Sequence, residues 1–360
     1  MQAGKTRPVL FSKAEWYDCL MEVEVRALVL DGNLRLETDR PVPATPAGEA
    51  LIRVLQAGIC NTDLELVKGY MAFKGVPGHE FVGVVESVSE SASAPSAALR
   101  GSSRDASYRL IGRRVVGEIN AACRTCETCR AGRPTHCPNR TTLGIDRRDG
   151  AFADYLTLPF ENLRPVPDTV THDQAVFVEP LAAACEIMQQ VHIQPTDRVV
   201  VIGDGKLGLL CAQVLQLTGC YLVALGRHAE KLDLLARRGI RVATSPDDVD
   251  RGADVVVEAT GSPAGFDTAR QLVRPRGTIV LKSTYQGELM VNLTKVVVDE
   301  VALIGSRCGP FEPALRLLEQ KSVDVESLIH ARYSLDDGLA AFERAAAQGT
   351  LKVMLELGHG

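Results

Sequence analysis

The cysteines are the residues whose spacing most directly suggests chemistry. The chain of 360 residues contains 10 of them, and four stand close together, Cys123, Cys126, Cys129 and Cys137. Two, two and seven residues separate neighbouring members, so four thiolates can converge tetrahedrally on a zinc ion at about 2.3 Å with no position left open. The spacing predicts a structural zinc site. An iron–sulfur cluster is the alternative, because cysteine runs of similar spacing hold those as well.

A second set of possible metal ligands lies upstream and at a domain junction. Cys60 precedes Asn61-Thr62-Asp63, His79 and Glu80 follow Gly78, and Glu179 stands before Pro180-Leu181. A thiolate, an imidazole and a carboxylate are the ligand mixture of a catalytic zinc that keeps one position open. Taken alone, Cys60 is better explained as a small buried side chain, and His79 as an ordinary core or surface residue.

A glycine-rich turn supplies the third chemical feature. An apolar strand predicted at Arg198–Ile202 leads into Gly203-Asp204-Gly205-Lys206-Leu207-Gly208, and an apolar helical stretch follows. Glycines between a strand and a helix allow a tight turn, and the helix N-terminus can then receive a pyrophosphate. The order strand, turn and helix therefore predicts a dinucleotide-binding site.

The next strand, Tyr221–Leu225, gives information on the cofactor. It ends in Gly226-Arg227-His228 rather than in the acid that holds the ribose hydroxyls of NAD, and Lys231 follows. A guanidinium and nearby cations favour a 2′-phosphate, so the sequence predicts NADP over NAD. If Arg227 points into solvent, the enzyme accepts both cofactors. Later strand ends predict further cofactor contacts at Thr260, Gly261, Ser283 and Arg307.

The elements that must position these residues indicate an α/β fold of two parts. Short strands at Val25–Leu30, Ala50–Leu55 and Phe81–Val88 are broken by glycine and proline and predict a β-rich catalytic domain. From about Asp173, helices alternate with apolar strands, which predicts the doubly wound parallel sheet of a Rossmann domain. The tail, a helix at Leu339–Ala347 and a strand at Leu351–Leu357, is expected to pack back on the first domain.

The expected boundaries divide the chain as follows. Residues 1–24 form an N-terminal extension, 25–178 with 310–360 the catalytic domain, and 179–309 the cofactor domain. Residues 89–107, rich in serine and alanine, predict a surface insertion.

Composition excludes other classes of partner. A net charge of -5 without a long basic block argues against nucleic acid as a partner. The absence of an apolar stretch of about 18 residues argues against a membrane span. We therefore expect a soluble, cytoplasmic protein.

In this order along the chain, these motifs resemble the zinc-containing medium-chain dehydrogenases of the alcohol dehydrogenase superfamily. The resemblance implies a GroES-like catalytic domain beside the Rossmann domain, with Cys60 and His79 as zinc ligands. Glu179 stands where alcohol dehydrogenases carry a cysteine ligand and sorbitol dehydrogenases a glutamate, which brings the chain closer to the sorbitol and threonine dehydrogenase branch. Glu80 either binds zinc or lies just behind it.

The same resemblance implies roles for residues beside the zinc. Asp63 would accept a hydrogen bond from His79, and Thr62 would take the proton of the substrate alcohol. Relatives often carry a histidine at the position of Glu65, so the proton exit runs through Glu65, the cofactor ribose or water. Tyr70, Phe73 and residues near Phe152 are expected to line the substrate cleft.

The resulting hypothesis is a zinc-dependent oxidoreductase that moves a hydride between an alcohol or polyol, or the matching carbonyl, and NAD(P). The expected cofactors are one catalytic and one structural zinc and NADP rather than NAD. The resemblance also implies a homodimer or homotetramer joined through the sheet edge near Val296 to Ile304. The alternatives are a zinc hydrolase, which leaves the glycine turn without a purpose, and a catalytically silent nucleotide-sensing or interaction protein of the same fold.

Overall fold

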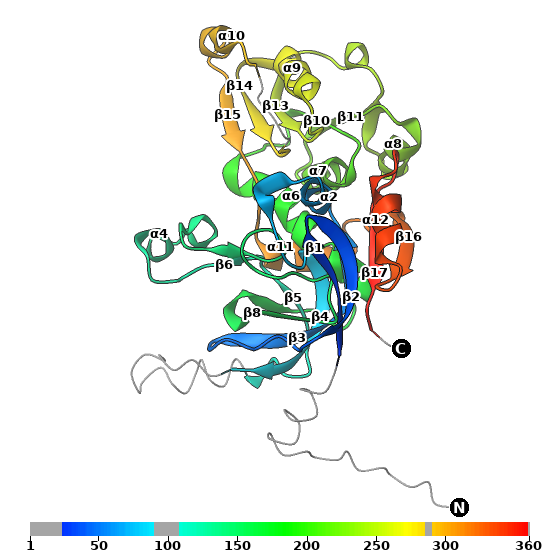
Figure 1. Cartoon of the computed structure of the whole chain (residues 1–360). Coiled ribbons are helices and arrows are strands. Elements are labelled where there is room, and N and C mark those ends of the chain that lie inside the picture. The colour runs from blue at the N-terminus through cyan, green and yellow to red at the C-terminus, as the bar shows by residue number, and fades with distance from the viewer. Residues whose placement is uncertain (1–23, 90–107, 285–289, 359–360) are drawn as a thin grey trace, which may run out of the picture.

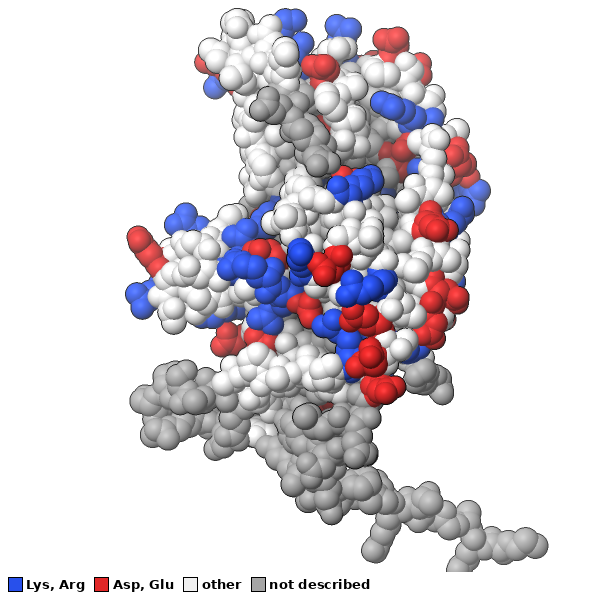
Figure 2. All heavy atoms as spheres, in the orientation of Figure 1, with Lys and Arg blue, Asp and Glu red and all other residues white. Residues whose placement is uncertain are grey.

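The chain forms two sheet-based parts, which occupy the lower and upper halves of Figure 1. The computed structural model describes residues 24–89, 108–284 and 290–358. The predicted extension 1–24 and insertion 89–107 therefore lie outside the described residues, apart from their end residues 24 and 89. Basic and acidic side chains are interspersed over the face drawn in Figure 2. Among the described helices, none is long and apolar enough to cross a membrane.

The lower part is built around β3 (Glu49–Ile59) and β4 (Glu80–Val88), which pair antiparallel. Its sheet has the order β16-β17-β3-β4-β5-β9, and β8 also pairs with β3. The remaining strands are β5 (Arg114–Gly117), β8 (Tyr155–Pro159), β9 (Leu163–Pro165), β16 (Ile329–Ser334) and β17 (Lys352–Glu356). Two small sheets pair β1 (Val25–Asp31) with β2 (Asn33–Arg40), and β6 (Asn120–Ala121) with β7 (Thr141–Thr142). Because β17 pairs with β3, the tail returns to the first domain, as the sequence predicts.

The upper part is a six-stranded sheet in the order β12-β11-β10-β13-β14-β15, and every pair in it is parallel. The strands are β10 (Arg198–Ile202), β11 (Tyr221–Leu225), β12 (Arg241–Ala243), β13 (Ala253–Glu258), β14 (Val273–Leu281) and β15 (Ala302–Gly305). The order reverses between β10 and β13, which is the doubly wound arrangement with its ligand crevice at the switch point. Helices cover both faces, so the inner strands are nearly continuous apolar runs.

The helices from α6 onward cover this sheet and the junction of the two parts, except α12, which packs on β16 and β17 of the lower sheet (Figure 1). They are α6 (Val178–Gln190), α7 (Lys206–Gln216), α8 (Ala229–Ala236), α9 (Pro263–Leu272), α10 (Leu293–Val298), α11 (Phe311–Glu319) and α12 (Gly338–Ala346). Helix α11 packs against α6, and the chain rejoins the lower sheet at β16. The domain boundary at 309 and 310 stays a prediction.

Short helices complete the two parts. They are α2 (Asn61–Val67), α4 (Glu127–Arg130), α5 (His172–Val176) and the 3₁₀ turns η1 (Tyr70–Ala72), η2 (Pro134–His136), η3 (Phe160–Asn162), η4 (Pro246–Asp248) and η5 (Glu326–Leu328). Of these, α2, α4 and η2 carry or flank the cysteines that the sequence predicts as metal ligands.

Candidate functional site

The four clustered cysteines meet in a lobe beside α4, which projects from the lower domain in Figure 1. The sulfur of Cys126 lies 3.5 Å from that of Cys129 and 3.7 Å from that of Cys137, and Cys137 lies 3.5 Å from Cys123. Tetrahedral zinc with bonds of about 2.3 Å places its sulfur ligands about 3.8 Å apart. The cluster therefore fits a zinc ion with no open position.

Cys60, His79 and Glu80 form the second group of potential ligands, and their ligand atoms lie within 4.8 Å of one another. Cys60 follows β3 and is the N-cap of α2, while Glu80 begins β4. Since these strands are antiparallel, the end of β3 meets the start of β4 at one edge of the sheet. A thiol, an imidazole and a carboxylate at this spacing fit a zinc ion with an open position.

Asp63 holds both turns that carry these ligands. Its carboxylate, fully buried, accepts hydrogen bonds from the backbone N–H of Cys60 at 2.7 Å and of Gly78 at 3.2 Å. Nδ1 of His79 lies 3.2 Å from Oδ1 of Asp63 but is not aligned for a hydrogen bond, and it has no other partner among the described residues. Burial opposes the charged form of His79, but Asp63 and Cys60 together raise its pKa well above the ordinary value.

Glu80 has a partner that the sequence analysis did not identify. Its carboxylate forms a buried ion pair with Lys352 of β17, and the Lys352 ammonium lies 5.4 Å from the ring centre of Phe177. A Cβ atom at Gly58 would come within 2.7 Å of Oε2 of Glu80, so glycine makes room for this pair. Lys352 is a basic residue directly followed by three apolar residues in β17, and this position is the signal in the sequence.

Glu179 lies in the first turn of α6 and is not a member of the three-residue group. Burial is the main cause that raises its pKa to about 7, with His79 acting against the rise and Glu80 adding to it. Its charge is thus coupled to two of the proposed ligands. The geometry favours Glu80 over Glu179 as the third protein ligand.

Thr62 and Glu65 differ in their relation to this group. Oγ1 of Thr62 lies 3.9 Å from the sulfur of Cys60, so its hydroxyl is beside the ligands. Glu65, further along α2, pairs with Lys68 at 2.9 Å, and the Lys68 side chain is 63% exposed. The exit of a proton through Glu65 stays a prediction.

The glycine turn has the geometry that the sequence predicts. Gly203 has a φ of +122°, and a Cβ atom there would lie 2.6 Å from the carbonyl oxygen of Ala259. A Cβ atom at Gly208 would lie 2.0 Å from the carbonyl oxygen of Gly203. Gly205 caps α7 at its N-terminus, where backbone N–H groups favour an anion.

A cavity of about 520 Å³ opens beside this turn, at the carboxyl ends of β10, β11 and β13. The predicted cofactor residues in its lining are Gly203, Gly205, Gly226, Arg227, His228 and Thr260. Asp204 lines it as well, and its carboxylate lies beside Arg227 and His228. In parallel sheets a dinucleotide binds at this edge.

Comparison with known proteins identifies the family. The family described as "Alcohol dehydrogenase GroES-like domain" matches residues 46–168, and the family "Zinc-binding dehydrogenase" matches residues 207–320. The chain belongs to the zinc-containing alcohol dehydrogenase superfamily. It is thus an oxidoreductase of the zinc-binding dehydrogenase type.

Relatives within the superfamily match nearly the full chain. A sorbitol dehydrogenase from Halalkalibacterium halodurans is 28% identical over 337 residues, 88% of this chain and 94% of that protein. A D-arabinitol dehydrogenase from Uromyces fabae is 28% identical over 338 residues, 88% of this chain and 92% of that protein. The solved structure of a zinc-binding dehydrogenase from Sinorhizobium meliloti, bound to NADP, is 27% identical with a TM-score of 0.80, and the match covers 93% of this chain and all of that one.

Several other predicted cofactor residues lie outside the lining of the cavity beside the glycine turn. Nζ of Lys206 reaches across to the carbonyl oxygen of Ile59 at 3.4 Å, next to Cys60. Arg307 donates a hydrogen bond to the carbonyl oxygen of Thr135, so it contacts the cysteine lobe. Leu207 packs against the core, Lys231 is buried in α8, Gly261 has a φ of +68°, and Ser283 follows β14.

The aromatic residues predicted for the substrate cleft differ in how deeply they are buried. Phe152 is fully buried in the core, with its ring edge-to-face against Phe342 at 5.6 Å between centres. Phe73 is also buried, among Leu30 and Leu66, while Tyr70 is half-buried. A Cβ atom at Gly78, the residue before His79, would lie 2.6 Å from Cδ1 of Phe152, so this ring packs against the turn that carries His79. That residues near Phe152 line the cleft stays a prediction.

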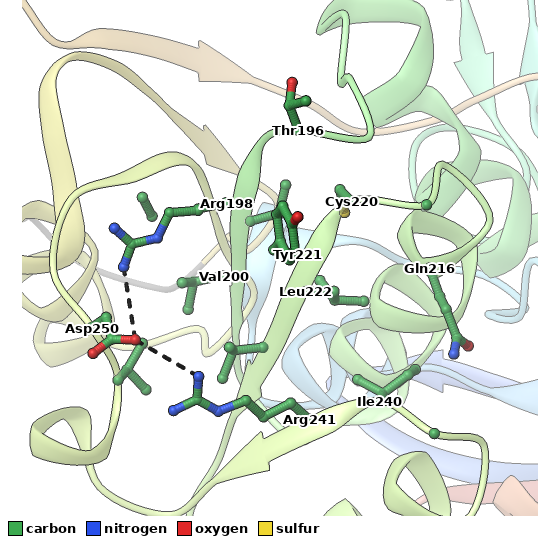
Figure 3. A pocket seen from close by; sticks show the side chains of 16 residues that line it. Thr196, Arg198, Val200, Gln216, Cys220, Tyr221, Leu222, Ile240, Arg241 and Asp250 are labelled. Carbon is green, nitrogen blue, oxygen red and sulfur yellow. Dashed lines mark ion pairs between the residues drawn. The ribbon is translucent and has the colours of Figure 1, made fainter.

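A larger cavity, of about 730 Å³, lies at the opposite ends of the same strands (Figure 3). Its lining includes the first residues of four strands, and Asp250 lies 3.9 Å from Arg198 and 3.7 Å from Arg241. Dinucleotides bind at the carboxyl ends of parallel strands, so the smaller cavity fits a dinucleotide better than the larger one does.

Proposed function

We propose that this dehydrogenase interconverts a polyhydroxylated alcohol and its carbonyl form at a zinc ion held by Cys60, His79 and Glu80, with a nicotinamide dinucleotide as hydride carrier. The observation that carries the proposal is the convergence of these three ligand atoms within 4.8 Å. Lys206 of the glycine turn contacts Ile59, the residue before Cys60, and so brings the turn close to the three ligands. The cofactor turn and the ligand group therefore face each other.

The residues around this group have distinct tasks. A zinc ion there would polarise the substrate oxygen and lower its pKa, and the nicotinamide would exchange the hydride. Asp63 fixes the backbone of both ligand turns. Oγ1 of Thr62 accepts the hydroxyl proton of the substrate, because it is the hydroxyl beside Cys60, and at the same time releases its own hydroxyl proton to Glu65, the cofactor ribose or water. Glu179, with a pKa raised to about 7, can accept or donate a hydrogen bond near neutral pH.

A polyol is the substrate class that we propose. The sorbitol and D-arabinitol dehydrogenase relatives are named for such substrates. Glu118 adds to the rise of the Glu179 pKa, and Asn120 donates a hydrogen bond to Glu118 at 2.5 Å. Oδ1 of Asn120 is buried without a hydrogen-bond partner in the described part of the chain. Unsatisfied acceptors of this kind suit a substrate with several hydroxyls.

A second zinc, bound by the four cysteines of the lobe, is part of the proposal. For the nicotinamide cofactor, the sequence-based preference for NADP stays a prediction. It is supported by the exposed Arg227 at the cavity. The carboxylate of Asp204, treated below, argues for NAD instead.

The experiment that tests the function combines metal analysis with activity. The purified protein should contain two zinc ions per chain and should oxidise sugar alcohols with either dinucleotide in preference to simple primary alcohols. Tight zinc and dinucleotide binding without turnover on a broad panel of alcohols and carbonyls would replace this proposal by the silent nucleotide-sensing protein.

We also propose a homodimer formed through the free edge of β15. Apolar side chains are exposed there and on α10: Val297 is 72% exposed, Val298 74% and Leu303 39%. An unpaired edge strand with apolar neighbours suits continuation of the sheet into a second copy. Light scattering should give twice the chain mass, and Leu303→Lys should give monomers. A tetramer and a cytoplasmic location stay predictions.

A further inference from the structure

The carboxylate of Asp204 occupies the place where NAD-binding Rossmann domains carry an acid after the second strand. That acid would stand at residue 226, directly after β11, but this residue is glycine. A Cβ atom built on Gly226 would lie 2.6 Å from both Cβ and Oδ2 of Asp204. The volume of the missing side chain is therefore filled by a carboxylate that comes from the glycine turn.

Two backbone N–H groups and the ring of His228 hold this carboxylate in position. Oδ2 of Asp204 accepts from the backbone N–H of Arg227 at 2.5 Å, from the backbone N–H of His228 at 2.7 Å and lies 3.0 Å from Nδ1 of His228. Burial alone would raise the pKa of Asp204, but the hydrogen bonds from His228 and Arg227 lower it, so the group is ionised. For the other oxygen, Oδ1, no donor is found among the described residues.

We propose that Asp204 is a specificity-determining residue that selects NAD(H) over NADP(H), by supplying from the first turn the carboxylate that normally follows the second strand. This inference rests on the proposed function, because it concerns the cofactor of that same site. An ionised carboxylate accepts hydrogen bonds from the ribose hydroxyls of NAD.

The same carboxylate disfavours the 2′-phosphate of NADP for two reasons. Like charges at close range repel, and the site lies in a cavity that shields them from water. The backbone N–H groups of Arg227 and His228, which could otherwise bind phosphate oxygens, are already occupied by Oδ2. Arg227 remains as an exposed cation at the cavity, which is a weaker attraction because solvent screens it.

The test measures the ratio of the dissociation constants of NADPH and NADH by fluorescence titration of the zinc-loaded full chain. Because the two ligands differ only in the phosphate, the ratio is insensitive to the fraction of folded protein. We expect the wild type to bind NADH more tightly by about tenfold or more, the value of one hydrogen bond to a charged group. Asp204→Ala should shift the ratio toward NADPH by about tenfold or more on the same basis.

A relocation of the carboxylate sharpens the test. In Asp204→Gly/Gly226→Asp, the acid stands after β11 and residue 204 no longer has the Cβ atom that would collide with it, so NADH preference should return. Arg227→Ala is the matched control at the same cavity and should change the ratio less than Asp204→Ala. An unchanged ratio in Asp204→Ala, or a wild type that prefers NADPH and loses this preference in Arg227→Ala, overturns the inference. If the wild type binds neither dinucleotide, the proposed function itself fails.

Discussion

The four-cysteine lobe and the group of Cys60, His79 and Glu80 differ in how much of the fold each one needs. The cysteines of the lobe all lie between residues 123 and 137, on α4, η2 and the loop around them. The second group joins the end of β3 to the start of β4 and depends on Lys352 from the last strand. The first can form from local chain geometry, whereas the second exists only once the sheet is complete.

Because one ligand group is local and the other spans the sheet, we expect the two groups to affect stability and activity differently. A ligand group made by one loop can be lost while the rest of the domain remains folded, because local units open independently. A group built into the central sheet is coupled to the core, and it also carries the open position that chemistry requires. We therefore expect changes in the second group to affect catalysis and global stability, and changes in the first to act locally.

The group of Cys60, His79 and Glu80 is called the sheet-built group below. The largest expected effect follows from replacing one of its ligands. Cys60→Ser should lower kcat/KM by about a thousandfold or more, since the polarising metal is lost. Zinc content should fall by one ion per chain while the lobe keeps its own. Cys220→Ser, at a half-buried cysteine beside the larger cavity, is the matched control and should leave activity unchanged. Retention of both zinc ions in Cys60→Ser would contradict the assignment of this ligand.

The next effect concerns the ion pair between the ligand Glu80 and Lys352. Lys352→Met should lower the free energy of unfolding by about 3 kcal/mol, because it leaves the buried carboxylate of Glu80 without its partner. Chemical denaturation measures this loss. Lys68→Met, which breaks the exposed pair with Glu65, should have no measurable effect. Equal effects of the two substitutions would show that the Lys352 pair is not structurally important.

Proton transfer provides a smaller effect, which tests the chemistry of the sheet-built group directly. Thr62→Val should lower kcat by about a hundredfold through loss of the hydroxyl, at the lower end of general acid–base contributions. Thr62→Ser should keep most of the activity, and zinc content should stay unchanged in both. If Glu65→Gln lowers kcat as much as Thr62→Val does, the relay runs through Glu65 despite its pairing with Lys68.

The sequence predicts best those features that depend on a short stretch of chain. The strands expected at Arg198–Ile202 and Tyr221–Leu225 have these bounds in the structure, because buried parallel strands are uninterrupted apolar runs. The spacing of Cys123 to Cys137 is enough to predict that their sulfurs meet. The glycines at 203 and 208 are required by close backbone contacts that follow from the turn itself.

The features that the sequence does not predict depend on distant segments. Lys352 meets Glu80 only because β17 pairs with β3, and no local pattern specifies that pairing. Asp204 cannot be identified from the sequence as a carboxylate at the place of residue 226, because the direction of its side chain in the glycine turn is set by the N–H groups after β11. In both cases a charge acts at a position far from its own place in the chain.

The smallest expected effect tests the local character of the lobe. Cys129→Ser should release the zinc of the lobe and lower Tm by about 5 °C, because about 2 kcal/mol of binding energy is lost from one loop of a large domain. The Cys60 site should keep its zinc, and kcat measured well below Tm should stay close to that of the wild type. Hydrogen exchange should increase between residues 123 and 137 and remain slow in β3 and β4. A loss of kcat equal to that of Cys60→Ser would mean that the lobe and the sheet-built group fold as one unit, and the contrast between local and global assembly would then not hold.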